Sequence, residues 1–172
     1  CDIHGLEYNE VPIGFKHISK HIQERDDVLL GGEESGGIAV AGHIPERDGI
    51  YNGLLLVQFL MDTGKSVEEL KEEIYELTGS FGYGRLDWHV DPTQKTRILE
   101  ACSKGVFDGK MLGREVTERQ FMDGFKYYLS EDEWVMIRPS GTEPVLRLYA
   151  ESTTNEKAAE LLEQLKGELE GY

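Results

Sequence analysis

The apolar positions of residues 1–77 follow the pattern of a fold that mixes helices and strands. Val28-Leu29-Leu30 is a short apolar run that ends in two glycines, which predicts a buried strand followed by a loop. Residues 50–61 are almost continuously apolar and predict a helix that is buried on most sides. Ser66 and Glu69 have the spacing of a capping box, which predicts the start of a second helix. The inner face of this helix is expected to carry Val67, Leu70, Ile74 and Leu77. This part of the chain is therefore predicted to be an α/β domain.

The second part of the chain has short β-rich runs between helix signals. Asp91 and Pro92 suit the N-cap and the first position of a helix, and Gly105 suits its end. The β-rich runs that follow lie at 125–129, 134–137 and 146–150. A last helix is capped by residues 153–156. Its inward side is expected to carry Ala158, Leu161, Leu162, Leu165 and Leu169. These elements predict an α+β domain, with an antiparallel sheet and helices on one side.

A segment rich in glycine and small residues separates the two patterns. Residues 78–84 read Thr-Gly-Ser-Phe-Gly-Tyr-Gly, and the apolar periodicity changes after them. We expect a hinge at 78–84, between a first domain at 1–77 and a second domain at 85–172.

Composition and charge argue against several classes of partner. Of the 172 residues 39% are hydrophobic, which is enough material for a buried core. The 33 Asp and Glu outnumber the 18 Lys and Arg, and the net charge of −15 argues against nucleic acid and anionic membranes as partners. No apolar stretch approaches the roughly eighteen residues of a membrane-spanning helix. In so acidic a chain, the positions of the few arginines indicate where an anionic ligand could bind.

The start of the chain and its two cysteines indicate what kind of protein it comes from and where that protein acts. The first residue is Cys1 and no leader sequence is visible, so we expect the chain to be a piece of a longer protein. Cys1 and Cys102 do not form a disulfide framework, which is typical of a reducing compartment. A cytoplasmic location is therefore expected.

One candidate binding loop is the string Arg-Pro-Ser-Gly-Thr-Glu-Pro that starts at Arg138, between two predicted strands. Arg138 can make a bidentate charged contact, and Ser140 and Thr142 offer hydroxyl donors. Gly141 lets backbone N–H groups approach a ligand without a Cβ in the way. These groups suit a bound phosphate. The residues alone leave a second interpretation open, a tight hairpin in which the proline and the glycine only shape the turn.

A second candidate loop is the string Gly-Glu-Glu-Ser-Gly-Gly that starts at Gly32. Glu33 and Ser35 are two residues apart, so their side chains are expected to point to the same side and could bind neighbouring sugar hydroxyls. A solvated turn is the alternative. A hydrolase serine is disfavoured, because the G-x-S-x-G pattern requires glycine where Glu33 stands.

Both strings resemble motifs of the α-D-phosphohexomutase family, the phosphoglucomutases and phosphomannomutases. The string from Arg138 resembles the phosphate-binding signature of the family's last domain, where it holds the substrate phosphate that does not react. The resemblance implies phosphate contacts by Arg138, Ser140, Gly141 and Thr142, with Arg147 on the exit strand as a further candidate. The chain then corresponds to part of the third domain and to the fourth domain of the family.

The string from Gly32 resembles the sugar-binding loop of the family's third domain. The resemblance implies that Glu33 and Ser35 bind sugar hydroxyls. Glu34 and Gly37 resemble the phosphoglucomutase and phosphomannomutase branches more than the phosphoglucosamine branch. Further contacts with the substrate cleft are expected from Lys16, His43 and Arg47.

The resemblance implies a parent enzyme that interconverts hexose 1-phosphate and hexose 6-phosphate through a hexose 1,6-bisphosphate, with Mg²⁺. Its phosphoserine loop and its metal loop are absent from this sequence, so we expect no catalytic residue and no metal ligand in this piece. Its expected partners are a phosphosugar and the missing N-terminal domains, and the piece alone is expected to bind without turnover. The alternatives are a non-catalytic phosphosugar-binding module and a phosphoglucosamine mutase.

Overall fold

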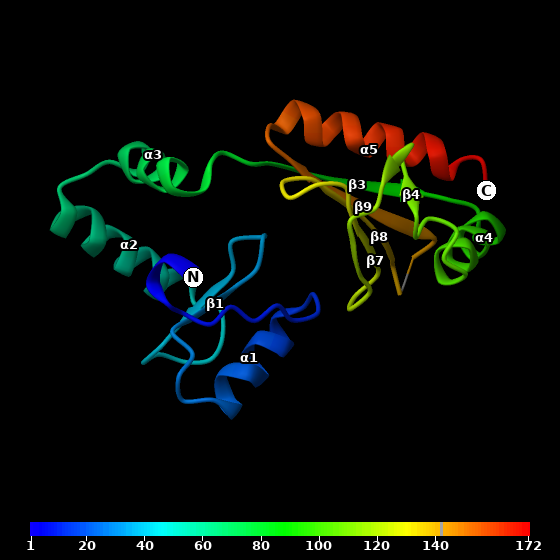
Figure 1. Cartoon of the computed structure of the whole chain (residues 1–172). Coiled ribbons are helices and arrows are strands. Elements are labelled where there is room, and N and C mark those ends of the chain that lie inside the picture. Colours follow the sequence, from blue (N-terminus) through cyan, green and yellow to red (C-terminus); the bar gives the residue numbers. More distant parts are fainter. Residues whose placement is uncertain (142) are drawn as a thin grey trace. The chain divides into compact units, whose positions relative to one another are not determined.

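The computed structural model describes residues 1–141 and 143–172, and the chain divides into two compact units (Figure 1). Unit 1 is Cys1–Glu73 and unit 2 is Ile74–Tyr172. The division falls inside a helix, a few residues before the hinge expected at 78–84.

Unit 1 mixes helices with one small sheet. Its elements are η1 (Asp2–His4), α1 (Phe15–Glu24), β1 (Leu30–Gly32), β2 (Ile38–Val40), α2 (Gly49–Thr63) and the first part of α3 (Val67–Thr78). Strands β1 and β2 form an antiparallel pair with Gly31 opposite Ala39. The α/β class predicted for this part of the chain is confirmed.

The core of unit 1 is small and lies between α1 and the strand pair. Its buried members are Phe15, Ile18 and Ala39. Gly31 of β1 lies so close to α1 that a Cβ there would be 2.4 Å from Cγ2 of Ile18. A larger residue at this position would force Ile18 to move, so glycine lets the helix pack directly on the strand.

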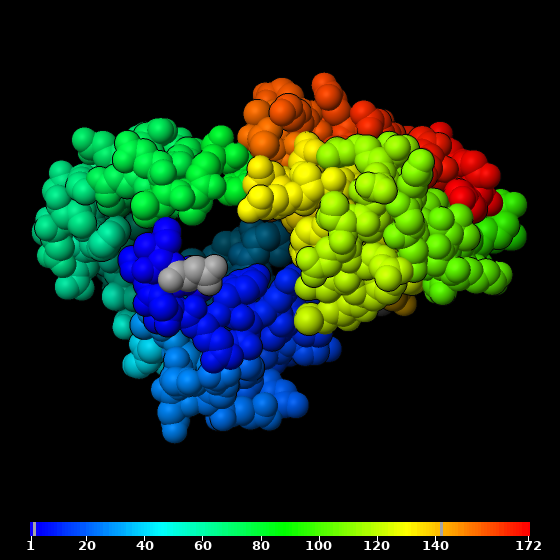
Figure 2. Space-filling model, viewed as in Figure 1, coloured from blue at the N-terminus to red at the C-terminus, as the bar shows by residue number. Residues whose placement is uncertain are grey.

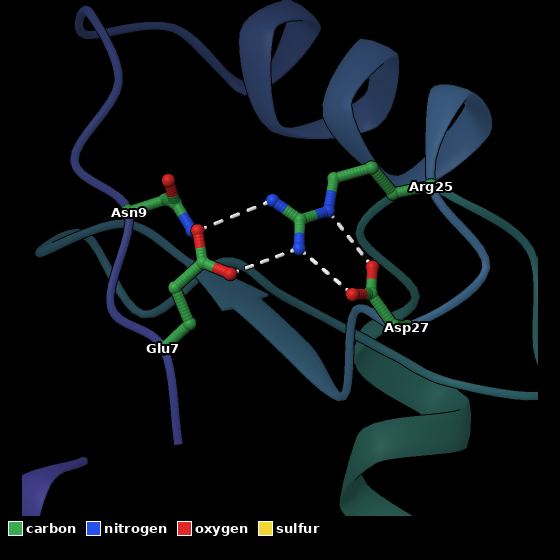
Figure 3. A network of polar contacts seen from close by, with 4 residues as sticks. All are labelled: Glu7, Asn9, Arg25 and Asp27. Atoms are coloured by element: carbon green, nitrogen blue, oxygen red, sulfur yellow. Dashed lines mark hydrogen bonds and ion pairs between the residues drawn. The ribbon is translucent and has the colours of Figure 1, made fainter. Parts of the chain in front are cut away.

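A network of hydrogen bonds and ion pairs connects the start of the chain to the end of α1 (Figure 3). Nη2 of Arg25 donates to Asp27 at 2.8 Å and to Glu7 at 3.0 Å. The hydrogen bond from Arg25 lowers the pKa of the Asp27 carboxyl to about 2 and also holds the pKa of Glu7 below its ordinary value. Asn9 donates a further hydrogen bond of 2.9 Å to Glu7. The segment before α1 is thus held by polar contacts.

Helices α2 and α3 are far more exposed than their sequences predict (Figure 2). Asp48 caps α2 by accepting hydrogen bonds from the N–H groups of Ile50 and Tyr51, and Gly64 ends the helix with φ of 68°. Yet Ile50 is 82% exposed and Met61 77% exposed. The prediction that residues 50–61 are buried on most sides is wrong for the described chain, because too little of it packs against this helix.

Two other predictions of buried apolar residues, for α3 and for the strand at Leu29 and Leu30, are also wrong. The capping box of α3 is confirmed, since the N–H of Ser66 donates to Glu69 and the N–H of Glu69 donates back to the Ser66 hydroxyl. The expected inner face of α3 is nevertheless not buried, and neither are Leu29 and Leu30, which were predicted to lie in a buried strand. The apolar pattern therefore predicts where α2, α3 and β1 lie, but it does not predict how exposed they are.

Unit 2 is built on a five-stranded antiparallel sheet in the order β3-β9-β8-β7-β6. Its elements are β3 (Gly82–His89), α4 (Pro92–Ser103), β4 (Lys110–Met111), β5 (Arg114–Glu115), β6 (Glu118–Gln120), β7 (Phe125–Tyr128), β8 (Trp134–Pro139), β9 (Val145–Ser152) and α5 (Asn155–Leu169). Strands β4 and β5 form a separate small pair. The predicted α+β class is confirmed.

Helix α5 packs on β3 and β9 and closes the core of unit 2 (Figure 1). All of its residues that were expected to face inward are buried, namely Ala158, Leu161, Leu162, Leu165 and Leu169. On the strand beneath, a Cβ at Gly82 would lie 1.9 Å from the backbone of Thr154, and one at Gly84 would lie 2.7 Å from Leu162. Gly82 and Gly84 therefore belong to the packed sheet, and the chain between α3 and β3 consists of residues 79–81 only.

The core of unit 2 lies between this face of the sheet and its helices. The side chains that are fully buried there include Ile98, Met111, Tyr127, Val135, Ile137, Leu146, Leu148, Leu165 and Leu169. Positions that alternate with the inward residues of the strands point to the other face of the sheet. Across the described residues, no helix is both long and apolar enough to cross a membrane.

Candidate functional site

The predicted phosphate loop connects β8 to β9, as expected from the sequence. Its base is closed by the Ser140 N–H, which donates to the carbonyl of Val145 at 3.0 Å. The N–H of Val90, just after β3, donates to the carbonyl of Pro144 at 3.1 Å. Ser140 is buried and Gly141 is exposed, with open space where a Cβ of Gly141 would be. The loop is thus fixed at its ends and open at Gly141. Thr142 lies outside the described residues.

Two arginines face each other at the base of this loop. Arg138 of β8 and Arg147 of β9 are direct partners in the antiparallel register, so their side chains leave the same face of the sheet. Nε of Arg138 donates to Oδ2 of Asp123 at 2.9 Å. Nε of Arg147 is buried and has no hydrogen-bond partner among the described residues. Two of the predicted phosphate-binding cations are therefore brought together.

Some negative charge balances Arg147 from the neighbouring strand. Asp87 of β3 is the register partner of Arg147 on its other side. The pKa of Asp87 lies below its ordinary value, chiefly because of its hydrogen bond with Arg85 and to a lesser degree because of the charge of Arg147. Since Asp87 already accepts hydrogen bonds from Nε and Nη2 of Arg85, at 2.8 and 2.7 Å, it offsets the charge of Arg147 only in part.

Asp123 is held against Arg138 by the glycine that follows it. Gly124 has φ of 124°, a conformation that favours glycine. A Cβ there would lie 2.7 Å from the carbonyl oxygen of Ile137 and 3.3 Å from Cα of Arg138. This close approach brings the Asp123 carboxylate alongside the guanidinium.

A lysine outside the predicted set also contacts the loop. Nζ of Lys95 donates to the carbonyl oxygen of Ser140 at 2.8 Å and to that of Glu143 at 3.0 Å. Lys95 lies in the first turn of α4, which Asp91 caps as predicted by accepting from the N–H of Thr93 at 2.8 Å. The contact with Ser140 spans 45 positions of the sequence, so no local pattern around Lys95 indicates it.

The predicted sugar loop is a tight turn between β1 and β2 of unit 1. The N–H of Glu33 donates to the Gly37 carbonyl at 2.9 Å, and the N–H of Gly36 donates to the Glu33 carbonyl at 3.0 Å. Gly36 has φ of 86°, which this turn requires. Ser35 lies at the exposed tip of the turn. Glu33 and Ser35 thus belong to one compact turn, and their binding of sugar hydroxyls stays a prediction.

The carboxylate of Glu33 is oriented by two partners. The N–H of Gly14 donates to Oε1 at 3.2 Å, and Nη1 of Arg47 lies 3.5 Å from Oε2. The guanidinium of Arg47 also lies over the ring of Phe15, 5.0 Å from its centre. With only 13% of its side chain exposed, Glu33 is held in one place. Lys16 is close by, with Cε 4.0 Å from the point where a Cβ of Gly14 would be.

His43 has a different environment from the other predicted residues. Its Nε2 lies 2.9 Å from Oδ2 of Asp48, and its ring stacks on that of Tyr51 with 3.9 Å between centres. The pKa of Asp48 is lowered first by the N–H of Tyr51 and then by His43. Of the candidate cleft residues, Arg47 contacts Glu33 directly, and the side chain of His43 contacts the start of α2.

No metal centre is found in the part of the chain that the structure describes. Within it, no three His, Cys, Asp or Glu side chains are grouped so that they could hold a metal ion. The Mg²⁺ implied by the sequence resemblance therefore finds no fitting ligand set among these residues.

Comparison with known proteins matches both parts of the chain to one family. The model of the phosphoglucomutase/phosphomannomutase alpha/beta/alpha domain III matches residues 1–78. The model of the phosphoglucomutase/phosphomannomutase C-terminal domain matches residues 98–168. The two loops described above fall one in each matched segment.

The similar proteins are named after different sugar substrates. The phosphoglucosamine mutase of Oceanobacillus iheyensis is 26% identical over 168 residues, which cover 98% of this chain and 33% of that protein. The phosphoglucomutase/phosphomannomutase of Thermococcus kodakarensis is also 26% identical, over 92% of this chain and 32% of its own length. The chain thus spans about a third of the length of the curated relatives that it matches.

Solved structures agree with this assignment. A candidate phosphomannomutase from Thermus thermophilus is 32% identical and superposes with a TM-score of 0.73, over 97% of this chain and 32% of that one. A phosphoglucomutase/phosphomannomutase family protein from Burkholderia thailandensis shares the fold at 19% identity, with a TM-score of 0.65 over 94% of this chain and 32% of that one. The chain belongs to the phosphoglucomutase/phosphomannomutase family and corresponds to its third and C-terminal domains.

Proposed function

We propose that this chain is the substrate-holding part of a phosphohexomutase that interconverts hexose 1-phosphate and hexose 6-phosphate through a hexose 1,6-bisphosphate. The observation that carries the proposal is the pair Arg138 and Arg147, which face each other beside the loop between β8 and β9. Family membership supports the class of reaction, and this pair supports the site of phosphate binding.

Like charges at directly opposite positions of a sheet destabilise it unless a counter-ion lies near them. Arg138 has the carboxylate of Asp123 as partner, whereas the buried Nε of Arg147 has none in the described part of the chain. A buried polar group without a hydrogen bond costs free energy. A bound phosphate, with several acceptor oxygens and a double negative charge, would neutralise the positive charge of the pair that Asp123 and Asp87 leave unbalanced.

The loop beside the arginines offers uncharged donors. Gly141 is exposed, and the space around it is open to a ligand. Ser140 adds a hydroxyl near the base of the loop, and Thr142 is assigned to the phosphate from its position in the motif. In a protein of net charge −15, this is a local positive site that would select the phosphate end of a substrate.

The turn that starts at Glu33 would bind the sugar. An oriented carboxylate accepts hydrogen bonds from vicinal hydroxyls, and the exposed Ser35 hydroxyl can donate or accept. Arg47, which is permanently charged, would orient Glu33 and could also contact a phosphate, but it cannot act as a base. Lys16 and His43 are proposed as further contacts of the substrate cleft.

Catalysis of phosphoryl transfer depends largely on positioning and on charge stabilisation. The residues of this chain would bind and orient the sugar and the phosphate that does not react. We propose that the phosphoserine and the ligands of Mg²⁺ belong to other domains of the parent enzyme, which would act in the cytoplasm. Mg²⁺ would stabilise the charge of the phosphoryl group in transfer, and the chain alone would bind substrate without turnover.

The hexose itself is proposed from two residues. Glu34 and Gly37 in the sugar loop favour glucose or mannose over glucosamine, whereas similar proteins bear both kinds of name at the same identity. Competition between glucose 1-phosphate, mannose 1-phosphate and glucosamine 1-phosphate in the parent enzyme would separate these substrates.

The phosphate site can be tested with the 172-residue chain itself. We expect glucose 6-phosphate to shift the amide resonances of Ser140 and Gly141 in ¹H–¹⁵N NMR spectra. Arg138→Met and Arg147→Met should each weaken binding by about tenfold or more, as expected for the loss of a charged contact. Arg97→Met, on the exposed side of α4, removes the same charge and serves as the control. Equal binding by all variants would contradict the proposed site.

The activity is tested in the parent enzyme. Mutase assays with Arg138→Met should show a higher KM for the hexose phosphate, while Arg97→Met should behave as the unsubstituted enzyme. Tight phosphosugar binding by a parent protein that has no mutase activity would instead favour the non-catalytic binding module.

A further inference from the structure

We propose that Lys95 is a positioning residue that holds the backbone at Ser140 and Glu143 so that Gly141 can receive a phosphate group. The inference rests on the proposed function of this loop and assigns a role to a residue outside its sequence motif. Lys95 comes from α4, in a different segment of unit 2, and reaches the loop through its ammonium group.

The ammonium of Lys95 bridges two points of the loop backbone. It donates to the carbonyl oxygens of Ser140 and Glu143, at 2.8 and 3.0 Å. The bridge therefore encloses Gly141, the residue at which the loop is open. A hydrogen bond from a charged donor is about twice as strong as a neutral one. One side chain thus binds the loop backbone at both Ser140 and Glu143.

The direction of the Ser140 carbonyl determines the direction of the next N–H. In a trans peptide unit the carbonyl and the following N–H point in opposite directions, and the described chain contains no cis peptide. Because the Ser140 carbonyl points to Lys95, the N–H of Gly141 points away from it. No hydrogen bond of this N–H is found to any described residue. Lys95 therefore turns a free backbone donor away from α4, toward the side where a ligand can approach.

The remaining backbone bonds of the loop do not perform this task. The N–H of Ser140 and the N–H of Val90 bind the carbonyls of Val145 and Pro144, which fixes only where the loop begins and ends. The N–H of Val145 donates to the Glu143 carbonyl at 2.8 Å, which tightens the exit. Among these contacts, only the bridge from Lys95 acts on the Ser140 carbonyl.

Lys95 is itself held in place. It is partly buried, and its own N–H donates to the carbonyl of Asp91 at 2.8 Å in the capped first turn of α4. Its positive charge behind the loop also favours an anion in front of it. Both effects depend on an ammonium group at this position, so an uncharged side chain of similar length should lose them.

The test is an NMR titration of the 172-residue chain with glucose 6-phosphate and, separately, with inorganic phosphate. Lys95→Met should raise Kd for both ligands by about tenfold, and Lys95→Arg, which keeps charge and donors, should recover most of the affinity. Lys104→Met is the matched control: it removes the same charge at the far end of α4, where Lys104 pairs with Glu100 at 2.9 Å. The amide resonance of Gly141 in the free protein should move in Lys95→Met and stay in Lys104→Met.

The outcomes separate this inference from the function on which it rests. If the unsubstituted chain binds, Arg138→Met does not, and Lys95→Met binds as tightly as Lys104→Met, the proposed function stands and the role of Lys95 is refuted. If the unsubstituted chain binds neither ligand, the proposed phosphate site is refuted and the inference falls with it. Should Lys95→Met fail to fold, Lys95→Gln takes its place, and unchanged affinity there counts against the inference equally.

Discussion

The carboxylate of Asp123 accepts a hydrogen bond of 2.9 Å from Nε of Arg138. This bond occupies one of the five N–H groups of the guanidinium and leaves the terminal nitrogens for a ligand. It also fixes the plane of a side chain that otherwise has many rotamers. Asp123 therefore both orients Arg138 and neutralises part of its charge.

The two effects of Asp123 can be separated by substitution. Asp123→Ala removes the orienting acceptor, and we expect the affinity for glucose 6-phosphate to fall by roughly three- to tenfold. Asp123→Asn keeps an acceptor and removes the negative charge, so its affinity should be equal to or higher than that of the unsubstituted chain. Isothermal titration calorimetry at matched ionic strength measures the affinity of both variants for glucose 6-phosphate. A parallel loss in the two variants would show that the charge, and not the orientation, is what matters.

Gly82 should tolerate no side chain. Its Cβ would lie within about 2 Å of the backbone between Thr154 and Asn155, where no side chain can move aside. We expect Gly82→Ala to destabilise unit 2 by more than about 2 kcal/mol, as overpacking of a rigid core does. Gly167→Ala on α5 is the control, because its Cβ would meet nothing within 4 Å and should stabilise the helix by about 0.5–1 kcal/mol. Denaturant unfolding followed by tryptophan fluorescence checks both.

The strand that contains Gly82 shows what the sequence could and could not reveal. Helices α4 and α5 were predicted because their signals are local: Asp91 and Thr154 are caps that bond within their own first turns. The sequence does not predict strand β3, because its inward side begins with Gly82 and Gly84, which are typical of a flexible hinge. The reason for these glycines is the closeness of α5, a distant segment of the chain. The alternation continues to the larger inward residues Leu86 and Trp88, and this could have indicated the strand.

The acid sensitivity of unit 2 should depend on Ser152. The fully buried Ser152 hydroxyl donates to Glu133 at 2.6 Å, and this bond is the main reason that the pKa of Glu133 lies below its ordinary value of 4.5. A lowered pKa in the folded state means that the stabilisation is complete above pH 4.5 and is lost as the pH falls through the lowered value. We expect the Tm difference between the unsubstituted chain and Ser152→Ala to be largest at pH 7.

The Tm difference between the unsubstituted chain and Ser152→Ala should shrink steadily below pH 4.5. Thermal unfolding followed by circular dichroism at pH 7, 5, 4 and 3 gives the comparison. Arg114→Gln, which removes the ion pair of Glu133 with Arg114, should show the same trend with a smaller amplitude, because that contact lowers the pKa less. A pH-independent difference for Ser152→Ala would contradict the assignment.

The two cysteines should differ sharply in reactivity. Cys102 is 1% exposed, and burial raises the pKa of its thiol from 9.0 to about 11, whereas Cys1 is exposed. Because the thiolate is the reactive form, the native chain should release about one equivalent from Ellman's reagent at pH 8 within minutes. Unfolding in guanidinium chloride should expose the second. The variant Cys1→Ser should react only after unfolding, and fast labelling of native Cys1→Ser would refute this.

The candidate site was predictable only in part. Arg138, Ser140, Gly141, Glu33 and Ser35 lie in short strings whose order carries the resemblance to the family. Lys95 and Asp123 act on one of those loops from other elements, through contacts that depend on how the sheet is assembled. Apolar periodicity likewise located α2 correctly, but it contains no information on how much protein lies against the helix. Ile50 and Met61 are therefore exposed although the apolar pattern predicts that they are buried.

The pairing of β3 with β9 has a consequence for the synthesis of the protein. Strand β3 is the first strand of unit 2 to leave the ribosome, yet its neighbour in the sheet is the last strand to be made. The N–H of Tyr83 bonds to the side chain of Asn155, 72 positions later. Contacts of such long separation slow folding. A nascent chain that stops before α5 would leave the glycine face of β3 uncovered, so unit 2 should acquire protease resistance only after α5 has been made.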